Sequence, residues 1–202
     1  MRRLTALFCL AVGVAGAADP PGPPASREAL ALCHRADDAP ESERAALLDR
    51  ALAQAERAVA ADDGDALAHF AVFCSLGGKM RRAGAGVGAL VELRRLRREI
   101  DRTLELAPDF ADALAGKGAL LLDAPRVLGG DPKDAERLLR RALEIDPDYL
   151  GPRFDLVRTL RARGAKDEAH AEAERALEIA RRKNDADGIK RAEGLLGDRA
   201  SR

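Results

Sequence analysis

One short phrase recurs four times along this 202-residue chain and restricts the possible fold more than any other feature. Each copy opens with an arginine and runs through helix-forming residues, and two copies end in Pro-Asp. The arginines lie 45, 39 and 34 residues apart, which is a unit of 34 residues with extra residues in the earlier copies. Self-similarity at such a period predicts a stack of helical repeats. The four copies begin at Arg57, Arg102, Arg141 and Arg175.

The composition favours an all-helical chain and excludes some partners. There is no Trp and one Tyr, and aromatic residues make up 3% of the chain. Ala, Leu, Arg and Glu are abundant, as is typical of helices. The chain has 34 basic and 34 acidic residues, whereas a nucleic-acid partner calls for a concentrated positive excess. We therefore expect no nucleic-acid partner.

The first residues have the anatomy of a secretory signal peptide. Two arginines follow Met1, residues 4–14 are apolar, and Ala15-Gly16-Ala17 supplies an A-x-A site. A membrane-spanning helix needs about 20 apolar residues, and this run is shorter. We expect residues 1–17 to be cleaved, which predicts a periplasmic or secreted protein. No segment after residue 20 is apolar enough to span a membrane, so we expect no transmembrane segment after cleavage.

The remainder divides into a leader, a repeat domain and a cap. Residues 18–25 are Pro-rich and predict an extended leader, after which Ser26 is expected to cap the first helix. Residues 26–182 form the predicted repeat domain, and residues 183–202 form a capping helix and tail. Asp65 is expected to cap the third helix. The predicted helices cover about residues 26–36, 41–61, 66–77, 86–106, 110–123, 133–145, 149–162, 166–182 and 187–196.

Two cysteines remain after the predicted cleavage, Cys33 and Cys74. An oxidising compartment would permit a disulfide between them. Both lie in apolar helical sequence, where cysteine is most often a small buried hydrophobic residue. The sequence leaves both interpretations open.

No motif in the chain predicts catalysis, a cofactor or a metal. Residues 84–89 match the dinucleotide pattern G-x-G-x-x-A, but no strand precedes them, so we interpret them as a flexible entry to a helix. The three histidines lack the paired spacing of metal ligands. His69 is expected to be a packed, hydrogen-bonded residue. We expect a non-catalytic protein because no acid–base or nucleophile constellation is present.

Small and large residues alternate in the later units at positions typical of one repeat family. Leu114, Gly118, Ala135 and Ala142 follow the pattern of the tetratricopeptide-repeat superfamily, which this chain resembles. The loop at residues 124–132, with the segment at 90–100, is similar to the periplasmic T-component of TRAP-type transporters and to the regulator-of-microtubule-dynamics group. The resemblance implies an all-α, right-handed α-solenoid of about four helical hairpins plus a C-terminal capping helix.

The resemblance also implies what such a chain does. Its expected role is protein–protein interaction or scaffolding in the cell envelope, with a protein or peptide as partner. The alternative is a small-molecule or lipid-binding accessory component of a periplasmic solute transport system. Aromatic residues and arginine are frequent binding anchors, and four of them fall at predicted concave-face positions: Phe70, Phe154, Arg158 and Arg161. The alternative is that Phe154 packs against the next helix and that the two arginines are solvated. The densest basic cluster, Arg94, Arg95, Arg97 and Arg98, is either a solvated surface or a site for an anionic partner.

Overall fold

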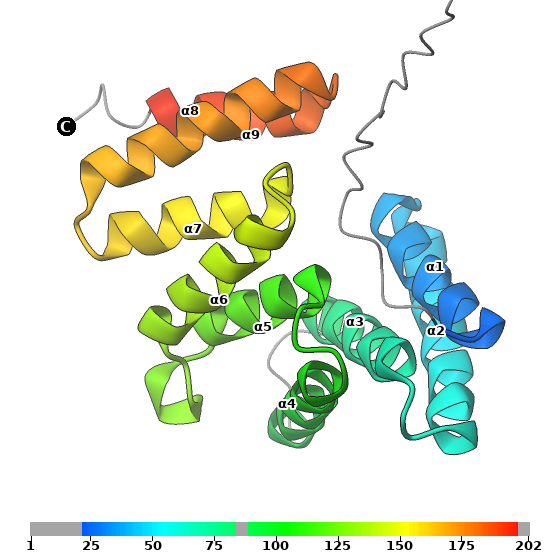
Figure 1. Ribbon diagram of the computed structural model, residues 1–202. Helices are drawn as coiled ribbons and strands as arrows, with labels where there is room; N and C mark the ends of the chain where they lie inside the picture. The colour runs from blue at the N-terminus through cyan, green and yellow to red at the C-terminus, as the bar shows by residue number, and fades with distance from the viewer. Residues whose placement is uncertain (1–21, 84–88, 198–202) are drawn as a thin grey trace, which may run out of the picture.

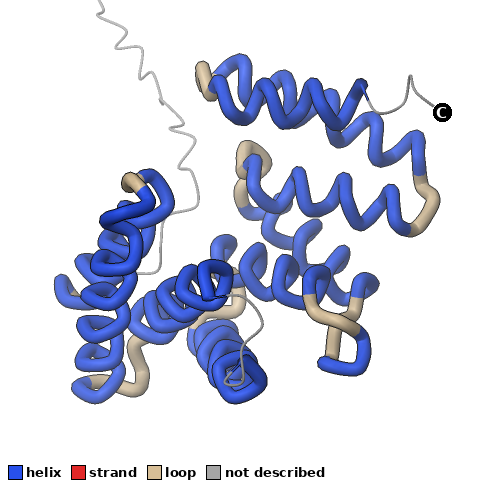
Figure 2. Tube along the Cα trace, turned by 180° about the vertical axis from the view of Figure 1, so that it is seen from behind, coloured by secondary structure: helices blue, strands red, loops and turns tan. Residues whose placement is uncertain are grey.

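The computed structural model describes residues 22–83 and 89–197, and within these ranges it contains nine α-helices, one short 3-10 helix and no strand. The helices follow one another around an arc, with α1 and α2 at one end and α8 and α9 at the other (Figures 1 and 2). The all-α prediction is confirmed. The predicted signal peptide, the predicted leader up to residue 21 and the glycine-rich segment at 84–88 lie outside the described residues.

Consecutive helices form hairpins, and each hairpin packs against the next. The short 3-10 helix η1 lies in the loop between the helices of the third hairpin. The four hairpins and the final helix match the predicted organisation. The elements are α1 (Pro24–Asp38) and α2 (Glu41–Ala61), α3 (Ala66–Ala83) and α4 (Ala89–Leu106), α5 (Ala111–Asp123), η1 (Arg126–Leu128) and α6 (Pro132–Ile145), α7 (Leu150–Ala162) and α8 (Lys166–Arg182), and α9 (Ala186–Gly197).

Small side chains allow the two helices of a hairpin to approach closely. A Cβ atom placed on Gly118 of α5 would lie 2.9 Å from Cγ of Leu139 on α6, so only glycine fits here without displacement. Ala135 and Ala142 of α6 are fully buried, and Ala176 of α8 is buried in the same way. Large residues fill the space between these contact points, which is how ridges on one helix pack into grooves on another.

The start of the repeat domain differs from the prediction in one detail. Helix α1 begins at Pro24, and Ser26 lies inside the helix instead of capping it. Proline suits the first helical turn because its fixed φ is helical and its missing N–H needs no partner there. The buried hydroxyl of Ser26 donates a hydrogen bond to Asp65.

Asp65 caps α3, as predicted. Its Oδ1 accepts hydrogen bonds from the backbone N–H groups of Leu67 at 3.0 Å and Ala68 at 3.2 Å. Since its Oδ2 also accepts the Ser26 hydroxyl, one carboxylate joins the first turn of α1 to the start of α3. The first two hairpins are thereby connected by a buried hydrogen bond.

Cys33 of α1 and Cys74 of α3 form a disulfide with a Cα–Cα separation of 6.3 Å. The bond joins the first hairpin to the second across 41 residues of sequence. Cross-linking a loop of this length stabilises a fold by about 2–4 kcal/mol, chiefly by restricting the unfolded chain. The sulfur atoms lie among apolar residues, including Leu47 and Leu48.

Aromatic rings join the second hairpin to the third. Phe70 of α3 packs edge-on against Phe110, with ring centroids 4.7 Å apart, and stacks on Phe73 at 5.9 Å. A Cβ atom on Gly116 of α5 would lie 2.7 Å from the Phe73 ring, so the ring rests directly on the α5 backbone. These contacts connect the N-terminal and C-terminal halves of the arc.

Helix α9 covers the end of the stack, as predicted. Ala192 is fully buried against α7 and α8, while Leu195 and Leu196 are half-buried. Its remaining surface is mostly polar and exposed, which suits a terminal cap. None of the described helices combines the length and the apolar composition that crossing a membrane requires.

The close helix crossings predict where added volume is not tolerated. Ala142→Leu or Ala176→Leu should each lower the free energy of unfolding by about 1–3 kcal/mol, because the larger side chain overpacks a fully buried contact. Ala162→Leu is the matched control, since Ala162 lies at the end of α7 and is much less buried. Urea unfolding followed by circular dichroism measures the three changes. Equal losses in all three variants would contradict the packing described.

Candidate functional site

The four predicted concave-face residues do not form one exposed site. Phe70 is 6% exposed and belongs to the core of the second hairpin, where it contacts Phe73 and Phe110. Phe154 of α7 is 3% exposed and packs with Ala176 of α8 and Ala192 of α9. The interpretation of these two rings as exposed anchors is wrong. The repeat spacing placed them on the first-helix face, but neighbouring elements cover that face at both positions.

Arg158 of α7 is half-exposed, but two carboxylates neutralise it. Its guanidinium donates to Asp123 of α5 at 2.7 Å and to Asp155 at 3.1 Å. The hydrogen bond to Asp123 raises the pKa of Arg158 above its usual value. Burial raises the pKa of Asp155, although the nearby Arg158 and Arg191 oppose that shift. Arg158 therefore joins α5 of the third hairpin to α7 of the fourth.

Arg161 has a structural contact as well. Its guanidinium donates to the backbone carbonyl of Leu195, which ties the end of α7 to the capping helix. The guanidinium of Arg191, from the same capping helix, lies 4.3 Å above the Phe154 ring in a cation–π contact. Helix α9 thus contacts two of the four predicted anchors, Phe154 and Arg161.

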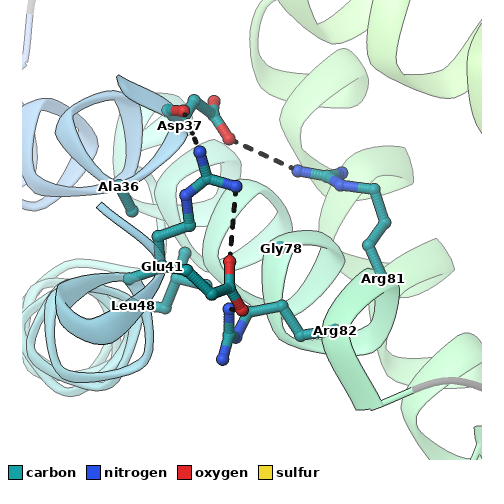
Figure 3. Close-up of a pocket in the computed structure, with 8 residues that line it drawn as sticks. Ala36, Asp37, Glu41, Leu48, Gly78, Arg81 and Arg82 are labelled. Carbon is teal, nitrogen blue, oxygen red and sulfur yellow. Dashed lines mark hydrogen bonds and ion pairs between the residues drawn. The ribbon is translucent and has the colours of Figure 1, made fainter. Parts of the chain in front are cut away.

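A first hollow of about 320 Å³ lies between the first hairpin and the end of α3, and we call it the α2–α3 hollow. Its charged side chains pair with one another, as Figure 3 shows. Glu41 accepts from Arg82 and from Arg44 at 3.5 Å, while Arg81 lies 3.6 Å from Asp37. The lining is Ala36, Asp37, Glu41, Arg44, Leu48, Gly78, Arg81 and Arg82.

A second hollow of about 290 Å³ lies between α4 and the loop that joins α5 to α6, and we call it the α4–loop hollow. It contains two members of the basic cluster noted in the sequence. The exposed apolar residues beside that cluster were not predicted as a site. The sequence contains a signal for this surface. Leu90 and Val91 are apolar residues at the start of α4, before its core-facing residues, and Val127 is an apolar residue in a loop. The lining is Leu90, Leu93, Arg94, Arg97, Val127, Leu128 and Gly129.

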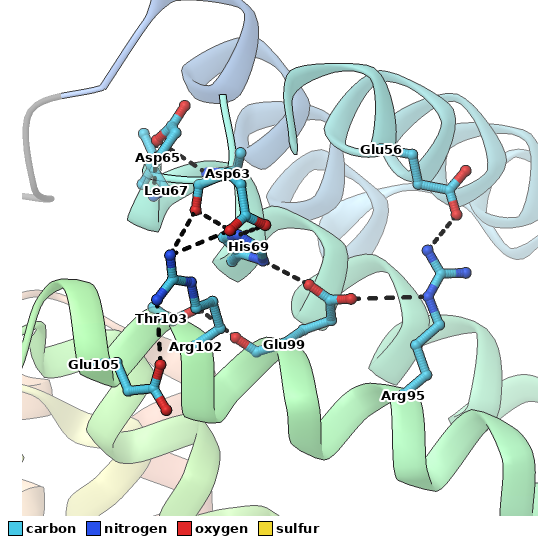
Figure 4. Close-up of polar contacts among 11 residues, drawn as sticks. Glu56, Asp63, Asp65, Leu67, His69, Arg95, Glu99, Arg102, Thr103 and Glu105 are labelled. Carbon is cyan, nitrogen blue, oxygen red and sulfur yellow. Dashed lines mark hydrogen bonds and ion pairs between the residues drawn. The ribbon is translucent and has the colours of Figure 1, made fainter. Parts of the chain in front are cut away.

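A network of polar side chains connects α3 to α4 within the second hairpin and extends to α2 (Figure 4). His69 of α3 is 4% exposed, and its Nδ1 lies 2.7 Å from Oε2 of Glu99 on α4. Its Nε2 lies 3.2 Å from the carbonyl oxygen of Asp63. Glu99 also lies 4.0 Å from Arg95, which reaches Glu56 of α2. The prediction that His69 is packed and hydrogen-bonded is confirmed, and its partners account for its polar atoms without a ligand.

The described residues include no cluster of three or more His, Cys, Asp or Glu side chains arranged to hold a metal ion. The geometry instead offers helical hairpins, paired surface charges and two shallow hollows. This arrangement fits contact with another molecule at a surface.

Comparison with known proteins agrees with this geometry. The family model described as "Tetratricopeptide repeat" matches residues 128–192. Residues 128–192 therefore match the tetratricopeptide-repeat family. The matched residues run from the end of η1 to α9, and the recurring phrase extends the same hairpin pattern toward the N-terminus. The narrower resemblance to the T-component group stays a prediction.

Solved structures share the tetratricopeptide fold along most of the chain. TTC0263, a thermophilic TPR protein of Thermus thermophilus, is 22% identical with a TM-score of 0.62, covering 82% of this chain and 80% of that one. YrrB, whose structure is described as a TPR protein with an unusual peptide-binding site, is 20% identical with a TM-score of 0.53, covering 86% and 79%. MamA is 17% identical with a TM-score of 0.52, covering 80% and 76%. These similarities show the fold. No curated protein matches the chain significantly.

The repeat register explains two largely buried polar pairs, of which Arg153–Glu172 is an ion pair. His69, Leu114 and Arg153 occupy equivalent positions in the first helices of three successive repeats. Their second-helix partners are also equivalent: Glu99, Leu138 and Glu172. Arg153 is 6% exposed and forms an ion pair with Glu172, which is 8% exposed, whereas Leu114 and Leu138 belong to one apolar cluster. One packing position thus accepts either two opposite charges or two apolar side chains.

This equivalence predicts a matched substitution. Glu172→Leu alone should cost about 3–5 kcal/mol, because it leaves the Arg153 guanidinium buried without its carboxylate. The double variant Arg153→Leu with Glu172→Leu reproduces the Leu114–Leu138 pair and should recover most of that loss. Urea unfolding measures both changes.

Glu174→Leu on the same helix is the control, since Glu174 is exposed and should change stability little. A double variant as unstable as the single one would show that the ion pair holds the fourth repeat together in a way that the apolar pair of the third repeat does not.

Proposed function

We propose that this chain is an exported, non-catalytic tetratricopeptide-repeat protein that mediates protein–protein interaction or scaffolding in the cell envelope. Tetratricopeptide-repeat proteins are generally interaction proteins without catalytic activity, and the family model matches residues 128–192 of this chain. The peptide-binding site named for YrrB belongs to a protein of the same fold. This supports a peptide or protein as partner.

The observation that carries the proposal is the curved hairpin stack with a disulfide between its first two hairpins. Disulfides form and persist in oxidising compartments and are rare in the cytosol. The Cys33–Cys74 bond therefore supports export, as does the signal-like sequence at residues 1–17. The two lines of support are independent, since one is a side-chain contact and the other is a sequence pattern.

A small-molecule or lipid-binding accessory role in periplasmic solute transport is the alternative. Pockets for small molecules typically have volumes of about 300–1,000 Å³ and bury most of the ligand. The two hollows, of about 320 and 290 Å³, lie just above and just below the lower limit of that range. The first lies between helices and the second between a helix and a loop. We therefore place protein binding ahead of small-molecule binding.

The proposal predicts the chemical form of the protein purified from its native cells. Mass spectrometry should find Ala18 or Asp19 at the N-terminus and a peptide pair linked through Cys33 and Cys74. Adding dithiothreitol should lower the free energy of unfolding by about 2–4 kcal/mol, because the cross-link across 41 residues is lost.

Retention of Met1 in a cytosolic protein in which Cys33 and Cys74 are free thiols would contradict export. An adduct of constant mass in native mass spectrometry, without any protein cross-linked in envelope extracts, would instead favour the accessory role.

A further inference from the structure

The large hydrophobic residues that are exposed in the described part of the chain gather at one surface. They are Leu90, Val91 and Val127, which are 51%, 67% and 92% exposed. Leu90 and Val127 line the α4–loop hollow from opposite sides, and Val91 follows Leu90 on α4. Single exposed apolar residues are common on proteins, but a cluster rimmed by polar residues indicates a contact surface.

The loop that presents Val127 is held by its own backbone. Leu128 and Gly130 donate their N–H groups to the carbonyl of Pro125 at 2.8 and 3.0 Å, and Asp131 donates to Leu121 at 3.1 Å. Gly129 has a φ of 82°, which other residues rarely adopt. A Cβ atom on Gly130 would collide with the carbonyl oxygen of Ala124. Val127 is therefore exposed on an ordered turn, where a partner can meet it with little loss of conformational entropy.

A cation with unused hydrogen-bond donors lies beside this apolar surface. Nε and Nη2 of Arg97 are buried and have no hydrogen-bond partner. Its guanidinium lies against Gly129, where it fills the space that a Cβ atom would need. Oxygen Oε2 of Glu92 also lacks a partner, but five residues of helix separate the two by about 140°, so they project from different sides of α4. The charge of the Arg97 guanidinium has no carboxylate partner among the described residues, which favours an anionic ligand beside it.

The two hollows differ in how their charges are satisfied. In the α2–α3 hollow, the three arginines are matched by Asp37 and Glu41. The α4–loop hollow is lined by Arg94 and Arg97 and by no carboxylate, and no ion pair of either arginine is found among the described residues. The second surface is therefore complementary to negative charge, whereas each arginine of the first already has a carboxylate partner.

We propose that the α4–loop hollow is a docking site for an acidic and apolar segment of a partner protein. An Asp or Glu carboxylate of the segment accepts from Arg97, and neighbouring apolar side chains pack on Leu90 and Val127. Arg–carboxylate hydrogen bonds are among the stronger polar contacts in proteins. A protein segment fits better than a small amphiphile because Val91, which does not line the hollow, and Val127 are strongly exposed and can contact further side chains of a segment.

This inference rests on the proposed role in protein interaction and assigns it to a surface away from the predicted concave face. The hollow belongs to the second helix of one repeat and the interhelix loop of the next. The rings of Phe70 and Phe154 are buried in the core, and Arg158 is paired with two carboxylates. The α4–loop hollow, by contrast, combines exposed apolar side chains with unpaired cationic donors.

The test uses the purified full chain with its disulfide intact and a phage-displayed library of random dodecapeptides. Enriched peptides should carry Asp or Glu beside Leu, Ile, Val or Phe, and synthetic copies should bind in fluorescence anisotropy. Arg97→Gln should raise the Kd at least about tenfold, as expected when a charged hydrogen bond is lost.

Val127→Ser should weaken binding as well without changing the melting temperature, because that side chain is exposed. Arg50→Gln, at an exposed arginine of α2, and Arg158→Gln should leave the Kd within about twofold.

Several outcomes would overturn the inference and say what replaces it. Enriched peptides whose affinity depends on Arg158 and not on Arg97 would place binding on the concave face and leave the proposed function intact. Binding of dodecanoate that is lost in Arg97→Gln, with no peptide enriched, would assign the hollow to an amphiphile. No enriched peptide, together with no protein cross-linked in envelope extracts, would contradict both this inference and the proposed function.

Discussion

The close approach of paired helices is the constraint on which the rest of this structure depends. Gly118 has no room for a Cβ atom beside Leu139, and Ala135, Ala142 and Ala176 are fully buried at helix crossings. Large residues such as Leu139 fill the space beside these close contacts, so the paired helices pack along their length. The hairpins then stack on one another, as in other quasi-one-dimensional repeat proteins.

Each junction between hairpins uses different chemistry. The first two hairpins are joined by the Cys33–Cys74 disulfide and by the buried contact of Ser26 with Asp65. Phenylalanine rings join the second to the third, and Arg158 of α7 reaches Asp123 of α5. Within the hairpins, the equivalent pairs His69–Glu99 and Arg153–Glu172 take the place of apolar packing. The small residues bring the paired helices together, and the larger residues beside them differ in chemistry from one hairpin to the next.

The helix order could be predicted from the sequence because it depends on local signals. Asp65 marks the start of α3, and the recurring arginine phrase marks the end of each second helix. Ser26 was assigned the wrong role because its partner, Asp65, is 39 residues away and no local pattern reveals it.

Phe70 and Phe154 were assigned to a binding face for a related reason. Their repeat positions gave the correct helix face, but contacts with Phe110 and with α9 determine that this face is covered. Arg97 drew attention only as part of a charged run, because its lack of a partner depends on the loop packed beside it.

The central claim is that glycine and alanine set the helix pairing, and its most direct test is a nuclear Overhauser measurement on methyl-labelled protein. The structure predicts strong cross-peaks between the Hα protons of Gly118 and the methyl groups of Leu139, since these groups are in direct contact across α5 and α6. Cross-peaks from Leu139 to Leu156, Val157 and Leu160 should accompany them, because these residues share one core cluster. Absence of the Gly118–Leu139 cross-peaks, with Leu139 contacting α7 alone, would show that the third hairpin is not paired as described and would contradict the account.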